Sequence, residues 1–261
     1  MATKKKYVKI VGITGEGQDY NIYKMTLKEM TVGFFIGFAG GLCGAQIMFG
    51  NIILNLVMGG VAGIVALPLY GKLLHSKQRK LILMQFRDLL DSLSNSFSSG
   101  KNTPDAFSDA LNDMRLSFGE EAPITKEVAI ILAGLHSNFS IEELLGDMSL
   151  RCGIDDIGSF SDTFTVSNRI GGNLKKIVSD SRDIINDKIE IEMEIQTTLA
   201  ANKNEINILA VMPFAIVLAM GLLGEKSIGA NSAINIIVKF IALGLFAIAY
   251  AMGKKITNIK V

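Results

Sequence analysis

The chain has 261 residues, with 26 basic and 25 acidic side chains, 49% hydrophobic residues and a mean hydropathy of +0.37. That apolar content excludes an intrinsically disordered chain. The near-neutral charge excludes a dedicated nucleic-acid binder, which needs clustered Lys and Arg to neutralise phosphates. The apolar residues are concentrated in two blocks, which is typical of membrane-spanning segments rather than of a soluble domain.

The first block, Thr31 to Gly71, has 41 residues without Asp, Glu, Lys or Arg. Because about 20 helical residues span a hydrocarbon core, it predicts a hairpin with Thr31–Phe49 as the outward span and Ile52–Tyr70 as the return. Gly33, Gly37 and Gly41 recur every four residues, a spacing that lets helices in lipid approach closely. This stripe fits packing within the hairpin or contact with another subunit, and small residues on the return span favour the former.

The second block begins with Ile206–Gly224, 19 residues without a charge, and continues with Asn231–Met252, which is apolar apart from Lys239. It predicts a second hairpin. Basic residues flank the cytoplasmic ends of spans, so both termini and the centre are expected in the cytoplasm of a multi-pass cytoplasmic (inner) membrane protein. The flanking basic residues are Lys4, Lys5, Lys6, Lys9, Lys24, Lys28, Lys72, Lys77, Arg79, Lys80, Lys254, Lys255 and Lys260, whereas the hairpin tips hold only Lys226.

The centre of the chain is polar and helical. Residues 72–205 contain 15 basic and 21 acidic residues, and apolar side chains recur at helical spacing from Ile82 to Phe97. Thr103 is expected to cap a helix that starts at Pro104, and Ser140-Ile-Glu-Glu143 is a capping box. No alternating β-branched run occurs, so the expected fold is all-α, with about six helices in this region.

A long helix is expected from Leu174, because neither Gly nor Pro follows until Pro213, and it enters the third span. The chain therefore divides into five predicted segments: 1–30, a cytoplasmic N-terminal segment; 31–71, the first transmembrane hairpin; 72–205, a cytoplasmic helical bundle; 206–253, the second transmembrane hairpin; and 254–261, a cytoplasmic tail.

Residues suited to catalysis are few. His75 and His136 have no Cys, Asp or Glu at ligand spacing, and Cys43 and Cys152 form neither a zinc motif nor a disulfide framework. The segment Gly221–Ser227 departs from a phosphate-binding loop, since Glu225 stands between the glycine and the lysine. We therefore expect no catalytic residue, cofactor or metal, and a protein that is not an enzyme.

Two features suggest partner contacts. Lys239 lies near the middle of the fourth span, where a lysine is costly unless it reaches the interface or meets an acidic group. An acidic stripe follows spacings of 3, 4, 3 and 4, which places its members on one helix face. The stripe fits a solvated surface, a docking surface for a basic partner, or a metal site; its members are Asp180, Asp183, Asp187, Glu190 and Glu194.

Four segments in order carry a resemblance to a known family: Gly100–Phe107, Ser140–Leu145, Arg151-Cys-Gly153 and Ser167–Leu174. Together they resemble the F domain of type II secretion and type IV pilus systems, over about residues 80 to 220. With one such domain and a hairpin on each side, the chain is most similar to the Tad (Flp) pilus assembly proteins TadB and TadC. The resemblance applies most directly to the Gly171-Gly172-Asn173 turn, for which it implies a structural role.

The resemblance implies a platform protein that couples a cytoplasmic secretion ATPase to assembly of pilin-like subunits in the bilayer. The implied partners are the ATPase, the pilin-like subunits, lipid, and a second platform protein or another copy of the chain, with no nucleic acid. Two other functions stay open: a membrane-anchored scaffold or adaptor, and a small-solute transporter. A transporter would place more charged or broken helices at the membrane midplane than Lys239 and Pro213 provide.

Overall fold

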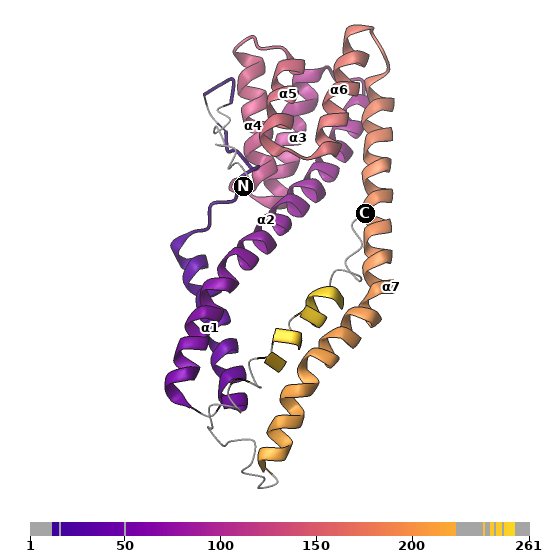
Figure 1. Cartoon of the computed structure of the whole chain (residues 1–261). Coiled ribbons are helices and arrows are strands. Elements are labelled where there is room, and N and C mark those ends of the chain that lie inside the picture. The colour runs from indigo at the N-terminus through magenta and orange to yellow at the C-terminus, as the bar shows by residue number, and fades with distance from the viewer. Residues whose placement is uncertain are drawn as a thin grey trace, which may run out of the picture. The chain divides into compact units, whose positions relative to one another are not determined.

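The computed structural model describes residues 12–15, 17–49, 51–222, 237, 241–242, 244–246 and 248–253. The described residues between 237 and 253 are helical, and no described residue lies in a strand. The predicted all-α class is therefore confirmed for the part of the chain that the structure describes. Between residues 12 and 222 the described helices are α1 (Leu27–Phe49), α2 (Ile52–Ser98), α3 (Thr103–Phe118), α4 (Pro123–His136), α5 (Ile141–Cys152), α6 (Asp155–Arg169) and α7 (Leu174–Leu222) (Figure 1).

Two described helices, α1 and α2, are long and apolar enough to cross a membrane. The 47-residue α2 contains both the predicted return span and the predicted helix over residues 82–97. The sequence predicts them as a transmembrane span and a helical run of the bundle, with the boundary between residues 71 and 72. A change of composition does not interrupt backbone hydrogen bonds, however, and α2 passes through both Pro68 and Gly71 without ending.

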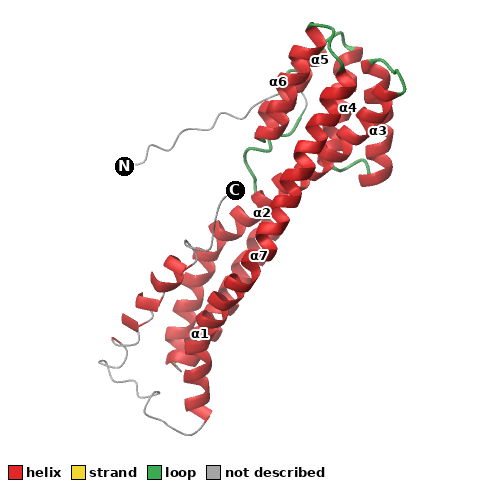
Figure 2. Ribbon diagram, turned by 90° about the vertical axis from the view of Figure 1, so that its right-hand side faces the viewer, coloured by secondary structure: helices red, strands yellow, loops and turns green. Residues whose placement is uncertain are grey.

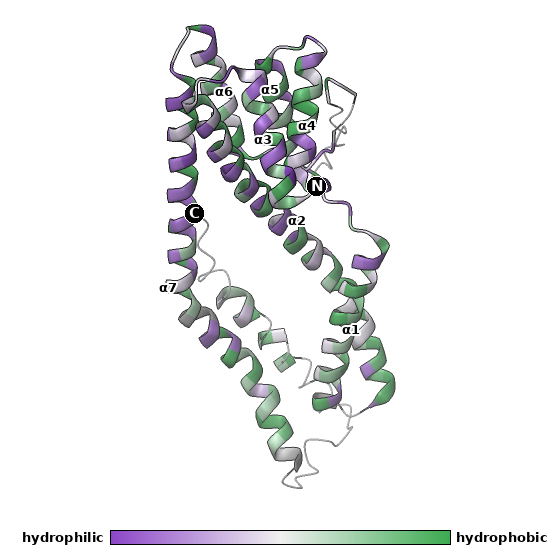
Figure 3. Cartoon of the chain, turned by 180° about the vertical axis from the view of Figure 1, so that it is seen from behind, coloured by the Kyte–Doolittle hydropathy of each residue, from purple (hydrophilic) through white to green (hydrophobic). Residues whose placement is uncertain are grey.

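The predicted long helix from Leu174 is present as α7, which has 49 residues and contains Pro213. Figure 3 shows its residues changing from hydrophilic to hydrophobic along its length. Residues 206–222, the described part of the predicted third span, belong to this helix. One uninterrupted element therefore contains both the acidic stripe and an apolar segment.

The chain forms two compact units. The first consists of the described residues up to Lys24 together with Leu73–Ile189, and the second consists of Met25–Lys72 with the described residues from Glu190 onward. Six helices contribute to the first unit: the later part of α2, then α3 to α6, and the start of α7. Figure 2 shows α3 to α6 as short helices joined by short loops.

The core of the first unit is apolar and continuous. Phe86 of α2 meets Phe160 of α6 edge to face, with ring centroids 5.4 Å apart, and Val178 and Ile185 bring α7 into the same buried cluster. Phe86 belongs to the helical periodicity that the sequence shows from Ile82 to Phe97. The core therefore fixes α2, α6 and α7 as neighbours within this unit.

Helix ends in the first unit follow local capping chemistry. The predicted capping box is confirmed, since the Ser140 hydroxyl accepts from the Glu143 backbone N–H and the Glu143 carboxylate accepts from the Ser140 N–H. The predicted cap at Thr103 is wrong by one residue. Asn102 caps α3 instead, its side-chain oxygen accepting from the Asp105 N–H at 2.9 Å. Asn is at least as good a cap as Thr, and α3 begins at Thr103, one residue earlier than predicted.

In the second unit, α1 packs against the first part of α2 through glycines. A Cβ added at Gly37 would lie 2.4 Å from the Cβ of Ala66, and one added at Gly41 would lie 2.6 Å from the Cβ of Ala62. Real Cβ atoms do not approach so closely, so only glycine permits this spacing of the two backbones. The structure thus favours hairpin packing, rather than contact with another subunit, as the role of this stripe.

Candidate functional site

The N-terminal segment is an integral part of the first unit, a role that sequence reasoning did not assign to it. Residues 12–15 and 17–24, named the strap, lie against the bundle. The Tyr20 N–H donates to the Arg151 carbonyl at 2.9 Å, and the Asn21 side-chain amide donates to the Leu150 carbonyl at 2.8 Å. Carbonyls at the end of a helix have no partner within it, and the strap therefore completes the end of α5.

A buried ion cluster lies beneath the strap. The Arg151 Nη1 donates to Glu127 Oε1 at 2.6 Å, and its Nε donates to Asp147 Oδ2 at 2.8 Å. Arg151 is 0% exposed and Glu127 only 1%. The Ile13 N–H of the strap donates to the second oxygen of Asp147 at 3.1 Å. One guanidinium thus forms ion pairs with a carboxylate of α4 and a carboxylate of α5. Asp147 links this cluster to the strap through its hydrogen bond with Ile13.

Burial is the largest cause of the pKa shifts of Glu127, Tyr20 and Cys152. It raises the pKa of Glu127 even though Arg151 acts in the opposite direction. Burial and the nearby Glu127 carboxylate both raise the pKa of the Tyr20 phenol, and burial raises the pKa of the Cys152 thiol to about 12. Since the thiolate is the nucleophilic form, Cys152 is chemically inert at neutral pH. The cluster is therefore a structural anchor rather than a set of reactive groups.

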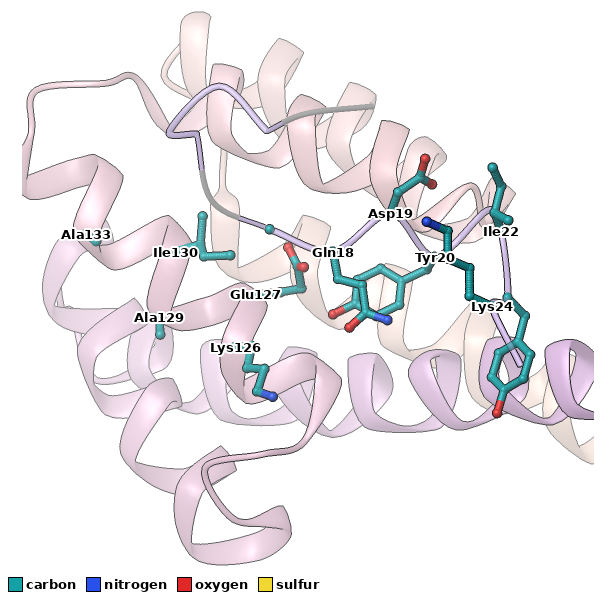
Figure 4. Close-up of a pocket in the computed structure, with 12 residues that line it drawn as sticks. Gln18, Asp19, Tyr20, Ile22, Lys24, Lys126, Glu127, Ala129, Ile130 and Ala133 are labelled. Atoms are coloured by element: carbon teal, nitrogen blue, oxygen red, sulfur yellow. The ribbon is translucent and has the colours of Figure 1, made fainter. Parts of the chain in front are cut away.

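A groove separates part of the strap from α4. Its volume is about 960 Å³, and it is lined by strap residues 17–20 and 22–24 and by Lys126, Glu127, Ala129, Ile130 and Ala133 of α4. Figure 4 shows side chains from the two elements lying along it. This volume lies within the range of pockets that bind ligands or peptide segments. We name this feature the strap groove.

All five members of the predicted acidic stripe are exposed on α7. Asp183 accepts from the guanidinium of its neighbour Arg182 at 2.8 Å, and Arg182 also pairs with Asp91 of α2 at 3.0 Å. The structure thus directs one basic residue toward the stripe. The stripe consists of Asp180, Asp183, Asp187, Glu190 and Glu194.

The Gly171-Gly172-Asn173 segment turns the chain between α6 and α7. Gly171 has φ +67°, a left-handed conformation that favours glycine, and the Gly172 N–H donates to the Ser167 carbonyl at 2.7 Å. The Asn173 side-chain oxygen accepts from the Lys176 N–H at 3.2 Å. The three residues therefore end one helix and cap the next.

The remaining sequence candidates carry little chemistry. His75 lies 3.2 Å from the Tyr20 carbonyl through its Nε2, and His136 is exposed. Across the described ranges, no three His, Cys, Asp or Glu side chains gather to hold a metal ion. Lys239 lies outside the described residues, so its expected partner contact stays a prediction.

Comparison with protein-family models, with curated proteins and with solved structures gave no match for this chain.

Proposed function

We propose that the chain is a cytoplasmic-membrane platform protein of a Tad (Flp)-type pilus or type II secretion-like machine. In this role it couples a cytoplasmic secretion ATPase to assembly of pilin-like subunits, and it is not itself an enzyme. The observation that carries the proposal is α7, because one 49-residue helix belongs to both compact units. A continuous helix is a rigid element through which one unit can bias the other.

Two further observations support this role. The helices α1 and α2 are long and apolar enough to span a membrane, as a platform embedded beside its pilins requires. The segments that carry the resemblance also lie at helix boundaries: Gly100 precedes α3, Ser140 caps α5, Gly153 ends α5 and Gly171 precedes α7. In the proposed topology, both termini and residues 72–205 face the cytoplasm, where they meet the ATPase.

The proposed mechanism uses the first unit as the ATPase contact and α7 as the coupler. The exposed carboxylates of the acidic stripe suit a basic surface, and α7 continues from them into its apolar segment. Movement imposed on the polar end of α7 would reach the apolar end without passing through a loop. Pilin-like subunits would then leave the bilayer beside the spans.

Identification of the proteins that bind the chain tests the proposal. A tagged copy is crosslinked mildly in native membranes and isolated, and the proteins that accompany it are identified. We expect a hexameric-type secretion ATPase together with small single-span pilin-like proteins. If neither is recovered while contacts between copies of the chain are captured, the platform role is wrong and a scaffold or adaptor is the better assignment.

The coupling role of α7 makes a separate prediction. Replacing the exposed pair Thr197-Thr198 by Gly-Gly should stop filament or substrate export, because each glycine weakens the helix by about 1 kcal/mol relative to alanine. The same pair replaced by Ala-Ala leaves the register and the rigidity of α7 unchanged and should preserve export. Export by the two variants is compared at matched protein levels. Equal export would show that α7 is not the coupler.

A further inference from the structure

The ion cluster beneath the strap holds more negative than positive charge. Glu127 and Asp147 bring two carboxylates, and Arg151 brings the guanidinium that pairs with both. Two basic side chains of α2, Arg79 and His75, contact backbone carbonyls. The three charged side chains of the cluster therefore leave one carboxylate charge without a counter-ion among them.

The contact that the cluster lacks is at one atom, Oε2 of Glu127. Both oxygens of Asp147 accept hydrogen bonds, one from Arg151 and the other from the Ile13 N–H, and Oε1 of Glu127 accepts from Arg151. The Glu127 Oε2 is buried and has no hydrogen-bond partner among the residues that the structure describes. The Tyr20 phenol lies close to this carboxylate, but a neutral hydroxyl does not balance its charge. A buried, charged acceptor without a donor is costly, so this atom suits a donor that carries a positive charge.

The Glu127 side chain lines the strap groove, and Figure 4 shows it among the side chains that lie along the groove. Asp19 of the strap, 8% exposed, is a second buried carboxylate in the lining. The groove volume of about 960 Å³ far exceeds the roughly 30 Å³ that a water molecule occupies. Part of the lining is apolar, at Ile22, Ala129 and Ile130. An organic cation fills such a space, whereas a bare inorganic cation leaves its apolar part uncovered.

The groove also carries positive charge, at the exposed side chains of Lys24 and Lys126. Lys126 is 2.6 Å from Glu121, but both side chains are exposed, and such surface pairs are weak. The lining therefore separates its charges by burial, since Asp19 and Glu127 are buried and the two lysines are exposed. A ligand with a single charge of either sign meets like charge in this groove. A ligand with an ammonium group and a carboxylate is complementary to both kinds of side chain.

We infer that the strap groove is a binding site for a zwitterionic organic ligand of the amino-acid class. Its ammonium group donates to the Glu127 Oε2, its apolar body packs on the apolar wall of α4, and its carboxylate meets Lys24 or Lys126. Because the groove is lined by both the strap and α4, a bound ligand adds contacts between them. This site does not depend on the proposed secretion role.

Three small probes of equal chain length test the site. δ-Aminovalerate carries an ammonium group and a carboxylate, valerate lacks the ammonium group, and pentylamine lacks the carboxylate. Each is added to the full-length chain in detergent, and its dissociation constant follows from the concentration dependence of the unfolding midpoint. δ-Aminovalerate should bind at least about tenfold more tightly than valerate, because a hydrogen bond to a buried charge is lost. It should bind a few-fold more tightly than pentylamine, because the lysines are exposed. If either analogue binds as tightly as δ-aminovalerate, or if δ-aminovalerate does not bind, the inference is wrong.

Substitutions at the two ends of the site assign the two charges. Glu127→Gln keeps the size of the side chain but removes its charge, and it should lower the affinity for δ-aminovalerate to that for valerate. The double variant Lys24→Met/Lys126→Met should remove the preference for δ-aminovalerate over pentylamine. The control Lys175→Met removes an exposed lysine of α7 that does not line the groove, and it should change no affinity. Wild-type affinities in both groove variants would overturn the inference.

A further variant separates ligand binding from stability. Glu127→Gln also weakens an ion pair with Arg151, so circular dichroism verifies that each variant is folded before affinities are compared. Ala133 lines the groove and is exposed, so Ala133→Phe fills part of the groove and leaves the ion cluster intact. This variant should keep the unfolding midpoint of the ligand-free protein and lose binding of δ-aminovalerate. Wild-type affinity in Ala133→Phe would place the ligand elsewhere and contradict the inference.

Discussion

Replacing Arg151 by methionine should lower the free energy of unfolding by about 3–5 kcal/mol, because removing one partner strands the other charges in the interior. Glu127 and Asp147 are 1% and 7% exposed, and Arg151 is the cation that both carboxylates contact. Thermal unfolding of the full chain in detergent, followed by circular dichroism, measures the loss as a fall in the transition midpoint.

A surface pair provides the control for this variant. Arg115 pairs with Glu120 at 3.0 Å, but their side chains are 41% and 70% exposed. Arg115→Met should therefore cost less than about 1 kcal/mol. Equal midpoints for the Arg151 and Arg115 variants would show that the buried cluster contributes no more than an exposed ion pair.

The loss in the Arg151 variant should also depend on pH, with a defined sign. Without the guanidinium, burial is opposed less and raises the pKa of Glu127 in the folded state further above its unfolded value. A carboxyl with a raised folded pKa favours the folded state below its unfolded pKa and loses this contribution as the pH rises through the folded value. The deficit relative to the wild type should therefore shrink toward acidic pH and grow toward neutral pH.

The second large effect is expected in the α1–α2 hairpin. Gly37→Leu introduces a Cβ that would lie 2.4 Å from the Cβ of Ala66 and 2.9 Å from the carbonyl oxygen of Ala62. Because one of these neighbours is backbone, the helices have to separate, and overpacking of this kind costs about 1–3 kcal/mol or more. We expect a lower yield of monodisperse protein and a lower unfolding midpoint.

Gly40 gives the matched control on the same helix. A Cβ at Gly40 has no neighbour within 4 Å among the described residues. Gly40→Leu should leave both the yield and the midpoint close to those of the wild type. If the two leucine variants behave alike, a general intolerance of leucine in α1, rather than close packing at Gly37, explains the result.

Features encoded locally could be predicted from the sequence. The capping box at Ser140 and the uninterrupted course of α7 from Leu174 depend on residues within a few positions of one another. The glycine spacing in α1 also indicated close packing, and the structure supplies its neighbours, Ala62 and Ala66. The continuity of α2 through Lys72 was not predicted, because the apolar span and the amphipathic run on either side differ in composition.

The strap and the ion cluster could not be predicted, for a physical reason. The contact between Asn21 and the Arg151 carbonyl joins residues 130 positions apart, and no local pattern encodes such a pairing. In sequence, Arg151 looks like an ordinary basic residue in the last turn of a helix, where it complements the helix dipole. Only its 0% exposure and its two carboxylate partners reveal its role.

The position of the strap in the chain also sets the timing of folding during synthesis. The strap is made before its hydrogen-bond partners at the end of α5, which are 129 and 130 residues further on. At ribosomal speeds of about 5–20 residues per second, this distance corresponds to roughly 10 s. During that interval the whole α1–α2 hairpin is synthesised. Synthesis of the hairpin therefore separates the strap from the rest of the first unit. The strap residues can form their native contacts only after α5 has been synthesised.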